Sequence, residues 1–161
     1  MKLTRKKLRR LIQEMVRQSE PGYHMSYLPD TKRISYTALV LDDMSHQALL
    51  QHVPNGWKPI AHHMTLITPR EHKGVRLPQR FLNQQASVMA TGIVGDDKVL
   101  AAVIDTSQSL LPMLGPGFPH ITIATNPMTK GKPFMSNQLN PSMAQQIQPI
   151  ILSGTIKEIM Q

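Results

Sequence analysis

Two short segments of the sequence repeat a pair of residues that suits acid–base chemistry. The first places Thr65 two positions after His63. The second places Thr122 two positions after His120, and its histidine lies 57 positions beyond that of the first. Side chains two positions apart in a strand share a face, so each segment presents an imidazole and a hydroxyl about 6–7 Å apart. Each pair can therefore exchange a proton and bind an oxyanion.

The residues that alternate with these pairs are apolar. Met64 and Leu66 occupy the opposite face of the first segment, and Ile121 and Ile123 that of the second. Alternation of polar and apolar residues is typical of a strand with one face in a hydrophobic core. Two such strands side by side would bring both imidazoles and both hydroxyls to one pocket.

Phosphodiester cleavage without a metal needs this set of groups. One imidazole takes a proton from the nucleophile, the other protonates the leaving oxygen, and hydroxyls hold the non-bridging oxygens. A metal site is not predicted, because His62 and His63 are adjacent and point to opposite faces of a strand, and no HExxH motif is present. We expect His62 to be a structural or surface residue. We also expect that the protein uses no cofactor.

The paired motifs resemble those of the 2H phosphoesterases, which include cyclic phosphodiesterases, RNA-end-processing enzymes and phage enzymes that degrade cyclic-nucleotide defence signals. The resemblance extends from about residue 35 to the C-terminus and includes a strand-helix-strand order in the first half. It implies an α+β fold with two lobes, in which pseudo-twofold halves of a mixed, largely antiparallel sheet form an open groove with helices outside. It also implies that four residues are catalytic, with His120 as the base and His63 as the acid: His63, Thr65, His120 and Thr122.

Five further residues are candidates for substrate binding. The aromatic side chains of Trp57, Tyr36 and Phe118 are able to stack on a nucleotide base. The alternative for each is packing in the core, as is usual for aromatic residues. Arg70 and Lys132 fall in polar loops and suit a phosphate group. Their alternative is a solvated loop.

Length and composition restrict the class of protein. The 161 residues suit one compact domain, and the absence of cysteine excludes disulfides and thiol nucleophiles. The sequence contains neither an apolar run long enough for a membrane span nor a secretory signal pattern. We therefore expect a soluble, cytoplasmic protein, located in the host cytoplasm if a phage encodes it.

The formal charge of +8 is concentrated near the N-terminus, where residues 1–17 carry a net +6. Apolar residues recur there with helical spacing, which predicts a basic amphipathic helix over 4–17 followed by a linker to residue 33. The phosphoesterase-like domain then occupies residues 34–161. The basic face admits three interpretations: a solvated surface, contact with RNA or a membrane surface, or a detachable leader.

Within the domain, hydrophobic patterns and turn residues predict the remaining elements. Besides the two motif strands, we expect strands at 34–41, 86–94, 99–105 and 149–159, and helices at 45–53 and 140–148. A long loop at 126–141 is either a functional lid or disordered.

These observations predict a metal-independent phosphodiesterase. Its substrate would be a cyclic nucleotide, a cyclic oligonucleotide or an RNA end with a 2′,3′-cyclic phosphate, so phage anti-defence and RNA repair both fit. The alternative is a non-catalytic RNA-binding protein that uses the same groove and the basic helix. Two intact acid–base motifs favour the enzyme.

Overall fold

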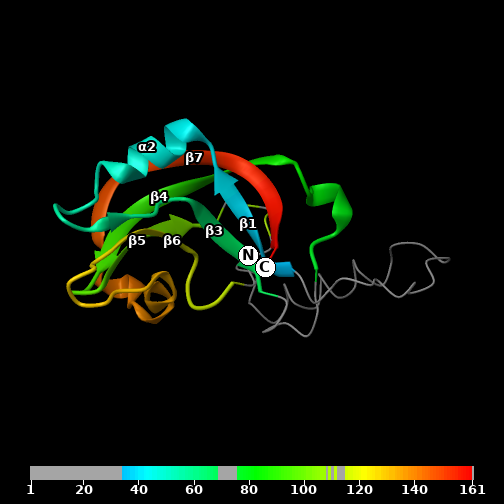
Figure 1. The fold of residues 1–161 in the computed structure, drawn as a ribbon. Coiled ribbons are helices and arrows are strands. Elements are labelled where there is room, and N and C mark those ends of the chain that lie inside the picture. The colour runs from blue at the N-terminus through cyan, green and yellow to red at the C-terminus, as the bar shows by residue number, and fades with distance from the viewer. Residues whose placement is uncertain (1–33, 69–75, 108, 110, 112–114, 161) are drawn as a thin grey trace. The chain divides into compact units, whose positions relative to one another are not determined.

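The computed structural model describes residues 34–68, 76–107, 109, 111 and 115–160 (Figure 1). Contacts divide the chain into two units, residues 1–33 and 34–161, and the described residues belong to the second. The predicted helix at 4–17, its linker and Arg70 lie outside the described residues. No helix of the described part is long and apolar enough to cross a membrane.

Strands make up most of the regular secondary structure in the described residues. They are β1 (Ile34–Leu41), β2 (Lys58–Pro59), β3 (His63–Ile67), β4 (Gln85–Gly95), β5 (Val99–Asp105), β6 (His120–Thr125) and β7 (Gln145–Met160). Helical structure in the part of the chain that the structure describes comprises α2 (Asp43–Leu50) and the short 3₁₀ helices η1 (Gln79–Phe81), η2 (Pro133–Gln138) and η3 (Pro141–Met143).

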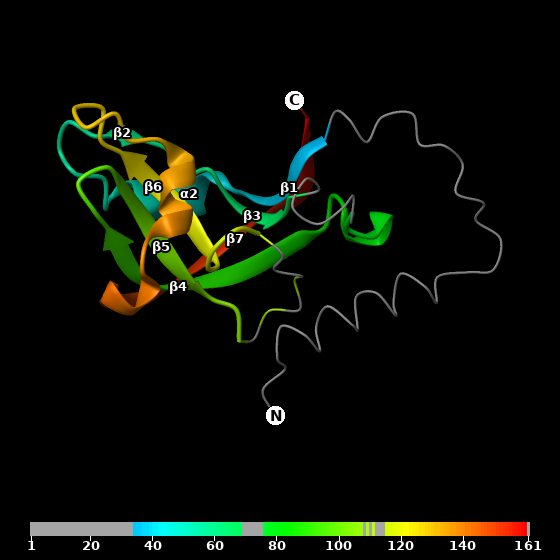
Figure 2. The same ribbon diagram turned by 90° about the horizontal axis from the view of Figure 1, so that it is seen from below.

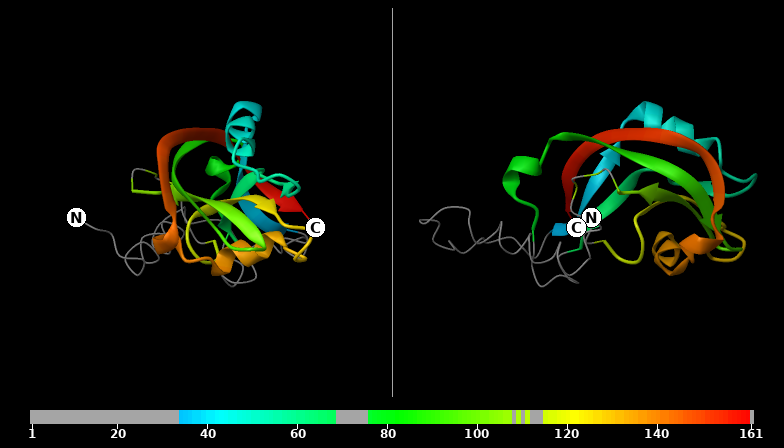
Figure 3. Two further views of the ribbon diagram at one scale, coloured as in Figure 1. Left: turned by 90° about the vertical axis from the view of Figure 1, so that its left-hand side faces the viewer. Right: turned by 180° about the vertical axis from the view of Figure 1, so that it is seen from behind.

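Six of these strands close into an antiparallel barrel. The order of neighbours is β6, β3, β1, β7, β4 and β5, and β5 pairs again with β6 to complete the ring. Strand β2 adds to β6 outside this ring. Figure 3 shows the strands curving around a common interior, with α2 on the outside. The predicted α+β fold with two lobes and outer helices is therefore wrong, because one closed, mainly β barrel takes its place.

Part of this error comes from the segment that follows the long loop. Asn140 caps a helical turn at the start of the predicted helix, since its side chain accepts hydrogen bonds from Ser142, but that turn ends after Met143. The chain then joins the sheet, where Gln145 pairs with Ile93 of β4. The second half of the predicted helix at 140–148 is thus strand, because pairing with a distant strand outweighs the weak local preference of glutamine-rich sequence.

Other local predictions are confirmed. The first strand has the predicted limits, and the hairpin of β4 and β5 turns at Asp96, whose carboxylate accepts hydrogen bonds from the backbone of Lys98 and Val99. Helix α2 starts earlier than the predicted residue 45 because Asp42 is its N-cap. A side-chain oxygen at the N-cap satisfies an otherwise unpaired amide of the first turn.

The barrel interior is filled by the apolar residues that alternate with the motif side chains. Met64, Leu66, Ile121 and Ile123 are each 0 % exposed, which confirms the predicted division of the two strands into polar and apolar faces. Burial of side chains of this size stabilises the fold by about 1.5–3 kcal/mol each. The core therefore fixes which way the polar face of each motif points.

Strand β7 connects the two sides of the barrel. Its first part pairs with β4 and its last part with β1 (Figure 1). The two pairings overlap at Gly154 and Thr155. A Cβ atom at Gly154 would collide with the carbonyl oxygen of Val40. Only glycine permits β1 to approach so closely at this crossing.

Candidate active site

The two His-x-Thr motifs lie on neighbouring strands. Strands β3 and β6 are antiparallel, with Met64 paired with Ile121. The positions on either side of this pair bring His63 opposite Thr122, and Thr65 opposite His120. The four polar side chains thus share the face opposite the buried apolar residues.

A change of backbone direction precedes the first motif. Ala61 is fully buried, has a φ of 42°, and donates its N–H toward the carbonyl oxygens of Thr122 and Ile123. A left-handed conformation at a non-glycine residue costs about 1–2 kcal/mol. These bonds hold the kink in place, and β3 starts two residues later with His63.

The imidazole of His63 stacks on an aromatic ring from the next strand. The ring of Tyr36 on β1 lies 5.0 Å from that of His63, centroid to centroid, with 22° between the planes. The two side chains are half-buried. Burial, together with smaller effects of charge repulsion from the imidazoles of His62 and His120, lowers the pKa of His63 to about 4. His63 is consequently neutral at pH 7.

His120 is held by contacts at both ring nitrogens. Its Nδ1 lies 2.6 Å from the carbonyl oxygen of Phe118, and its Nε2 lies 2.9 Å from the hydroxyl of Ser136. A carbonyl oxygen only accepts, so Nδ1 carries a proton and Nε2 is the nitrogen that titrates. Burial lowers the pKa of His120, while the bond to Phe118 acts in the opposite direction.

Ser136 connects the two residues of the second motif. Its hydroxyl is 2.8 Å from that of Thr122 and donates to the carbonyl oxygen of Pro133 at 2.6 Å. Ser136 is 1 % exposed and belongs to η2, which lies across β5 and β6 in Figure 2. Sequence reasoning missed this residue, although it falls in the long loop for which a lid was one interpretation.

Two glycines allow the chain that precedes β6 to pack closely in this region. A Cβ atom at Gly115 would lie 2.6 Å from the carbonyl oxygen of Thr65. At Gly117, which has a φ of +72°, it would lie 2.6 Å from that of Asn137. The glycine-rich approach to the second motif is thus explained by contact with the backbone of both β3 and η2.

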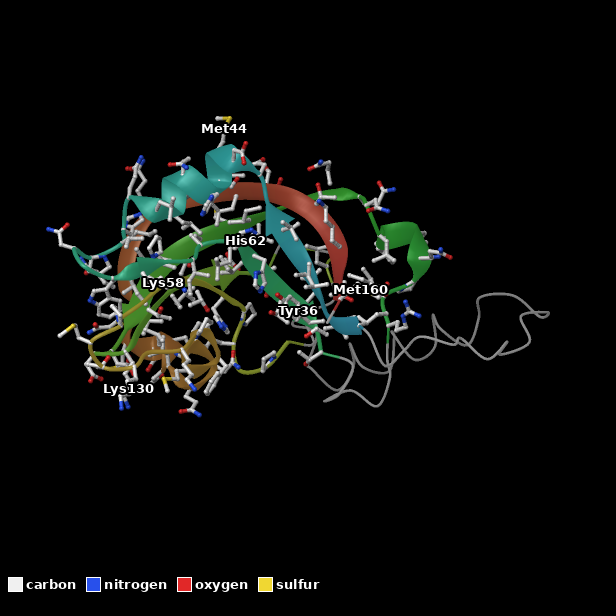
Figure 4. The ribbon with its side chains drawn as sticks, in the orientation of Figure 1. Tyr36, Met44, Lys58, His62, Lys130 and Met160 are labelled. Carbon is white, nitrogen blue, oxygen red and sulfur yellow. The ribbon has the colours of Figure 1, made fainter. Side chains whose placement is uncertain are left out.

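His62 lies beside the site and is exposed, as the sequence predicted for a surface residue. Its ring is 6.0 Å from that of His63 and 6.2 Å from that of His46 on α2, edge to face in both cases. Figure 4 shows His62 between α2 and the sheet. Within the described residues, no three histidine or acidic side chains form a group able to hold a metal ion.

The candidate binding residues differ in their distance from the motifs. Tyr36 stacks on His63, and the ring of Phe118 lies 4.8 Å from that of His120, so these two are at the site. Trp57 packs against the hydrophobic core. Lys132 is exposed at the start of η2. Their role in binding remains a prediction, as does that of Arg70.

Two histidine–hydroxyl pairs on adjacent strands are the defining feature of the 2H phosphoesterases, and the comparison with protein families agrees. The chain belongs to the family of the fungal tRNA ligase phosphodiesterase domain, whose model matches residues 1–154. The predicted 2H resemblance is confirmed, and the chain is a hydrolase of the phosphodiesterase class. The match includes the basic segment 1–33. Among curated proteins no match to the chain is found.

Proposed function

We propose that this protein hydrolyses the 2′,3′-cyclic phosphate at the end of an RNA. The observation that carries the proposal is the pairing of β3 with β6, which sets each motif histidine across from the threonine of the other motif. The family is named for the phosphodiesterase domain of a tRNA ligase, which supports an RNA end as substrate. Membership of a hydrolase family disfavours the non-catalytic RNA-binding alternative.

In this mechanism His63 is the base and His120 the acid. Neutral His63 takes a proton from water as the water oxygen attacks phosphorus. Protonated His120 gives its Nε2 proton to the departing ribose oxygen as the P–O bond breaks, which leaves a phosphomonoester and a free hydroxyl. The family resemblance suggested the opposite roles, but the low pKa of His63 favours the neutral form that a base requires.

The hydroxyls of Thr65 and Thr122 bind the non-bridging phosphate oxygens in this proposal. Each lies opposite a motif histidine, so the phosphate would be held between the two strands. Tyr36 and Phe118 flank the two imidazoles and offer ring surfaces to the nucleoside.

The test is a double-mutant cycle on the two histidines. Replacing His63 or His120 by Ala is expected to lower kcat by about 10²–10⁴, and the double variant should lose much less than the product, because the pair acts as a unit. Thr65→Val and Thr122→Val should slow turnover without unfolding the chain. Circular dichroism checks the fold of each variant.

The substrate panel comprises an RNA with a 2′,3′-cyclic phosphate end, free 2′,3′-cyclic nucleotides, linear oligonucleotides and cyclic dinucleotides, each with and without EDTA. Turnover of the RNA end that EDTA leaves unchanged is the expected result. A preference for cyclic dinucleotides would instead favour the anti-defence function. Activity that EDTA abolishes and zinc or manganese restores would contradict the metal-independent mechanism.

A further inference from the structure

The proton-transfer nitrogen of His120 is already engaged by the protein. Nδ1 bonds to the Phe118 carbonyl at 2.6 Å, and Nε2 lies 2.9 Å from the Ser136 hydroxyl. If His120 gives its proton to a substrate oxygen, that oxygen must come within hydrogen-bond distance of Nε2. The oxygen of Ser136 occupies this position.

The contacts of Ser136 match those expected of a phosphate oxygen. Its own proton is directed to the carbonyl of Pro133 at 2.6 Å, so its lone pairs are available to Thr122 at 2.8 Å and to protonated His120 at 2.9 Å. In the proposed mechanism both donors act on oxygens of one phosphate group, since His120 protonates the departing ribose oxygen and Thr122 binds a non-bridging oxygen. The hydroxyl of Ser136 therefore lies where an oxygen of that phosphate group would be bound.

We propose that Ser136 is a placeholder for the phosphate group: its hydroxyl fills the oxyanion position of the second motif, and residues 133–138 move away when a phosphate binds there. This inference rests on the proposed function, since it assigns the oxyanion position to His120 and Thr122. Segment 133–138 is then a plug that the substrate displaces.

The chain before the plug is firmly attached to the barrel. The side chains of Asn126 and Thr129 donate hydrogen bonds to the carbonyl of Asp97 at 2.8 and 2.7 Å. The backbone N–H of Asn126 donates to the carbonyl of Lys98 at 2.8 Å. Lys130 lies on this turn, at the lower edge of the molecule in Figure 4. These contacts anchor residues 126–131 on the hairpin of β4 and β5.

Apart from the contacts of Ser136 and Pro133 with the second motif, the bonds of the plug are local. Its 3₁₀ turns are closed by bonds from the Met135 amide to Lys132 at 3.0 Å and from the Leu139 amide to Ser136 at 3.2 Å. The large apolar side chain of Phe134 is 58 % exposed and contributes little burial. A short 3₁₀ segment with few buried apolar contacts is able to open locally while the barrel stays folded.

Hydrogen exchange in the wild-type protein tests the movement. Inorganic phosphate is titrated in, and exchange of the Met135 and Leu139 amides is followed by NMR. These amides should exchange faster with phosphate bound, whereas the amide of Gly131, bonded to Asn126 at 2.9 Å in the anchored turn, should not change. Exchange that is unchanged or slowed at Met135 and Leu139 would overturn the proposal.

The Ser136→Ala variant tests the competition directly, with Ser142→Ala on the exposed η3 as the matched control. Removing the competing hydroxyl should strengthen inorganic phosphate binding about tenfold, because phosphate no longer has to replace the bonds of Ser136 to His120 and Thr122. Calorimetry measures this affinity. Equal or weaker binding by Ser136→Ala, or no binding by either protein, would contradict the placeholder role.

Kinetic measurements distinguish the placeholder role of Ser136 from a positioning role. They also distinguish failure of this proposal from failure of the proposed function. With the cyclic phosphate RNA, Ser136→Ala should lower KM, whereas a fall in kcat with unchanged phosphate affinity would make Ser136 a positioning residue for His120 and overturn the proposal. If no variant hydrolyses any cyclic phosphate but Ser136→Ala still binds inorganic phosphate more tightly, the proposed function fails and the placeholder stands.

Discussion

His63 and His120 sit in different environments although their motifs are alike. His63 stacks on Tyr36 and has two imidazoles, His62 and His120, as electrostatic neighbours. His120 bonds to the carbonyl of Phe118 through Nδ1. A base must be neutral and an acid protonated, so these surroundings decide the pH at which the pair works.

The first prediction at this scale is an acidic optimum for kcat/KM. His63 is neutral only above its pKa of about 4, so the rate should fall as the pH drops through that value. His120 loses its proton as the pH rises through a pKa below the usual 6.5, and the rate should fall again. A pH profile of kcat/KM for cyclic phosphate hydrolysis should therefore peak between about 4 and 6.5.

His62→Ala refines this test. Removing His62 takes away a positive charge that lowers the pKa of His63, so the acidic limb should move to higher pH while the alkaline limb stays. His52→Ala, beyond the end of α2, is the matched control and should leave both limbs in place. An unmoved acidic limb in a folded His62→Ala protein would contradict this account of His63.

Among the elements, β7 determines whether the barrel closes. It pairs with β4 along its first part and with β1 along its last part, and the two pairings overlap at Gly154 and Thr155. Strand β1 in turn pairs with β3, placing Val40 opposite His63. The position of the first motif thus depends on β7, which carries no site residue itself.

We predict that Gly154→Ala destabilises the protein by about 1–3 kcal/mol, because its Cβ would collide with the carbonyl oxygen of Val40 and force the backbones apart. Denaturant unfolding measures the change in free energy. Gln148→Ala, at an exposed position of the same strand, is the control and should alter stability by less than about 0.5 kcal/mol. An unchanged free energy of unfolding in Gly154→Ala would show that β1 and β7 are not tightly packed at this position.

For the whole molecule, the main electrostatic feature is an uneven distribution of charge. Residues 1–17 carry a net +6 of the total +8, which leaves the rest of the chain nearly balanced. The family match starts at residue 1, so this segment lies within the length that the family model spans. The charged segment and the two motifs lie in different parts of the sequence. The contribution of the segment to binding a long polyanion should therefore be separable from the chemistry of the motifs.

Deleting residues 1–17 should weaken binding to single-stranded RNA and flatten its salt dependence, because fewer counterions are released. Fluorescence anisotropy at several salt concentrations measures both effects. Hydrolysis of a small 2′,3′-cyclic nucleotide should be largely retained. A truncated protein that folds but no longer hydrolyses the small substrate would show that the segment is needed at the active site.

Local sequence determined the two motifs and the direction of their side chains. A strand alternates its faces by backbone geometry alone, so apolar Met64 and Ile121 were enough to place His63 and His120 on the other face. The same reasoning gave the limits of β1 and the hairpin of β4 and β5, whose turn residues are adjacent in sequence. The membership of the 2H class followed from these few positions.

Only the tertiary structure decided that the strands close into a barrel and that Ser136 reaches His120. The pairing of β5 with β6 joins two strands that are separated in sequence by residues 106–119, and no local pattern encodes that choice of partner. Ser136 lies 16 positions from His120 in a loop with no regular period. Contacts of this kind depend on how the whole core packs, which is why the fold class was mispredicted while the motif strands were not.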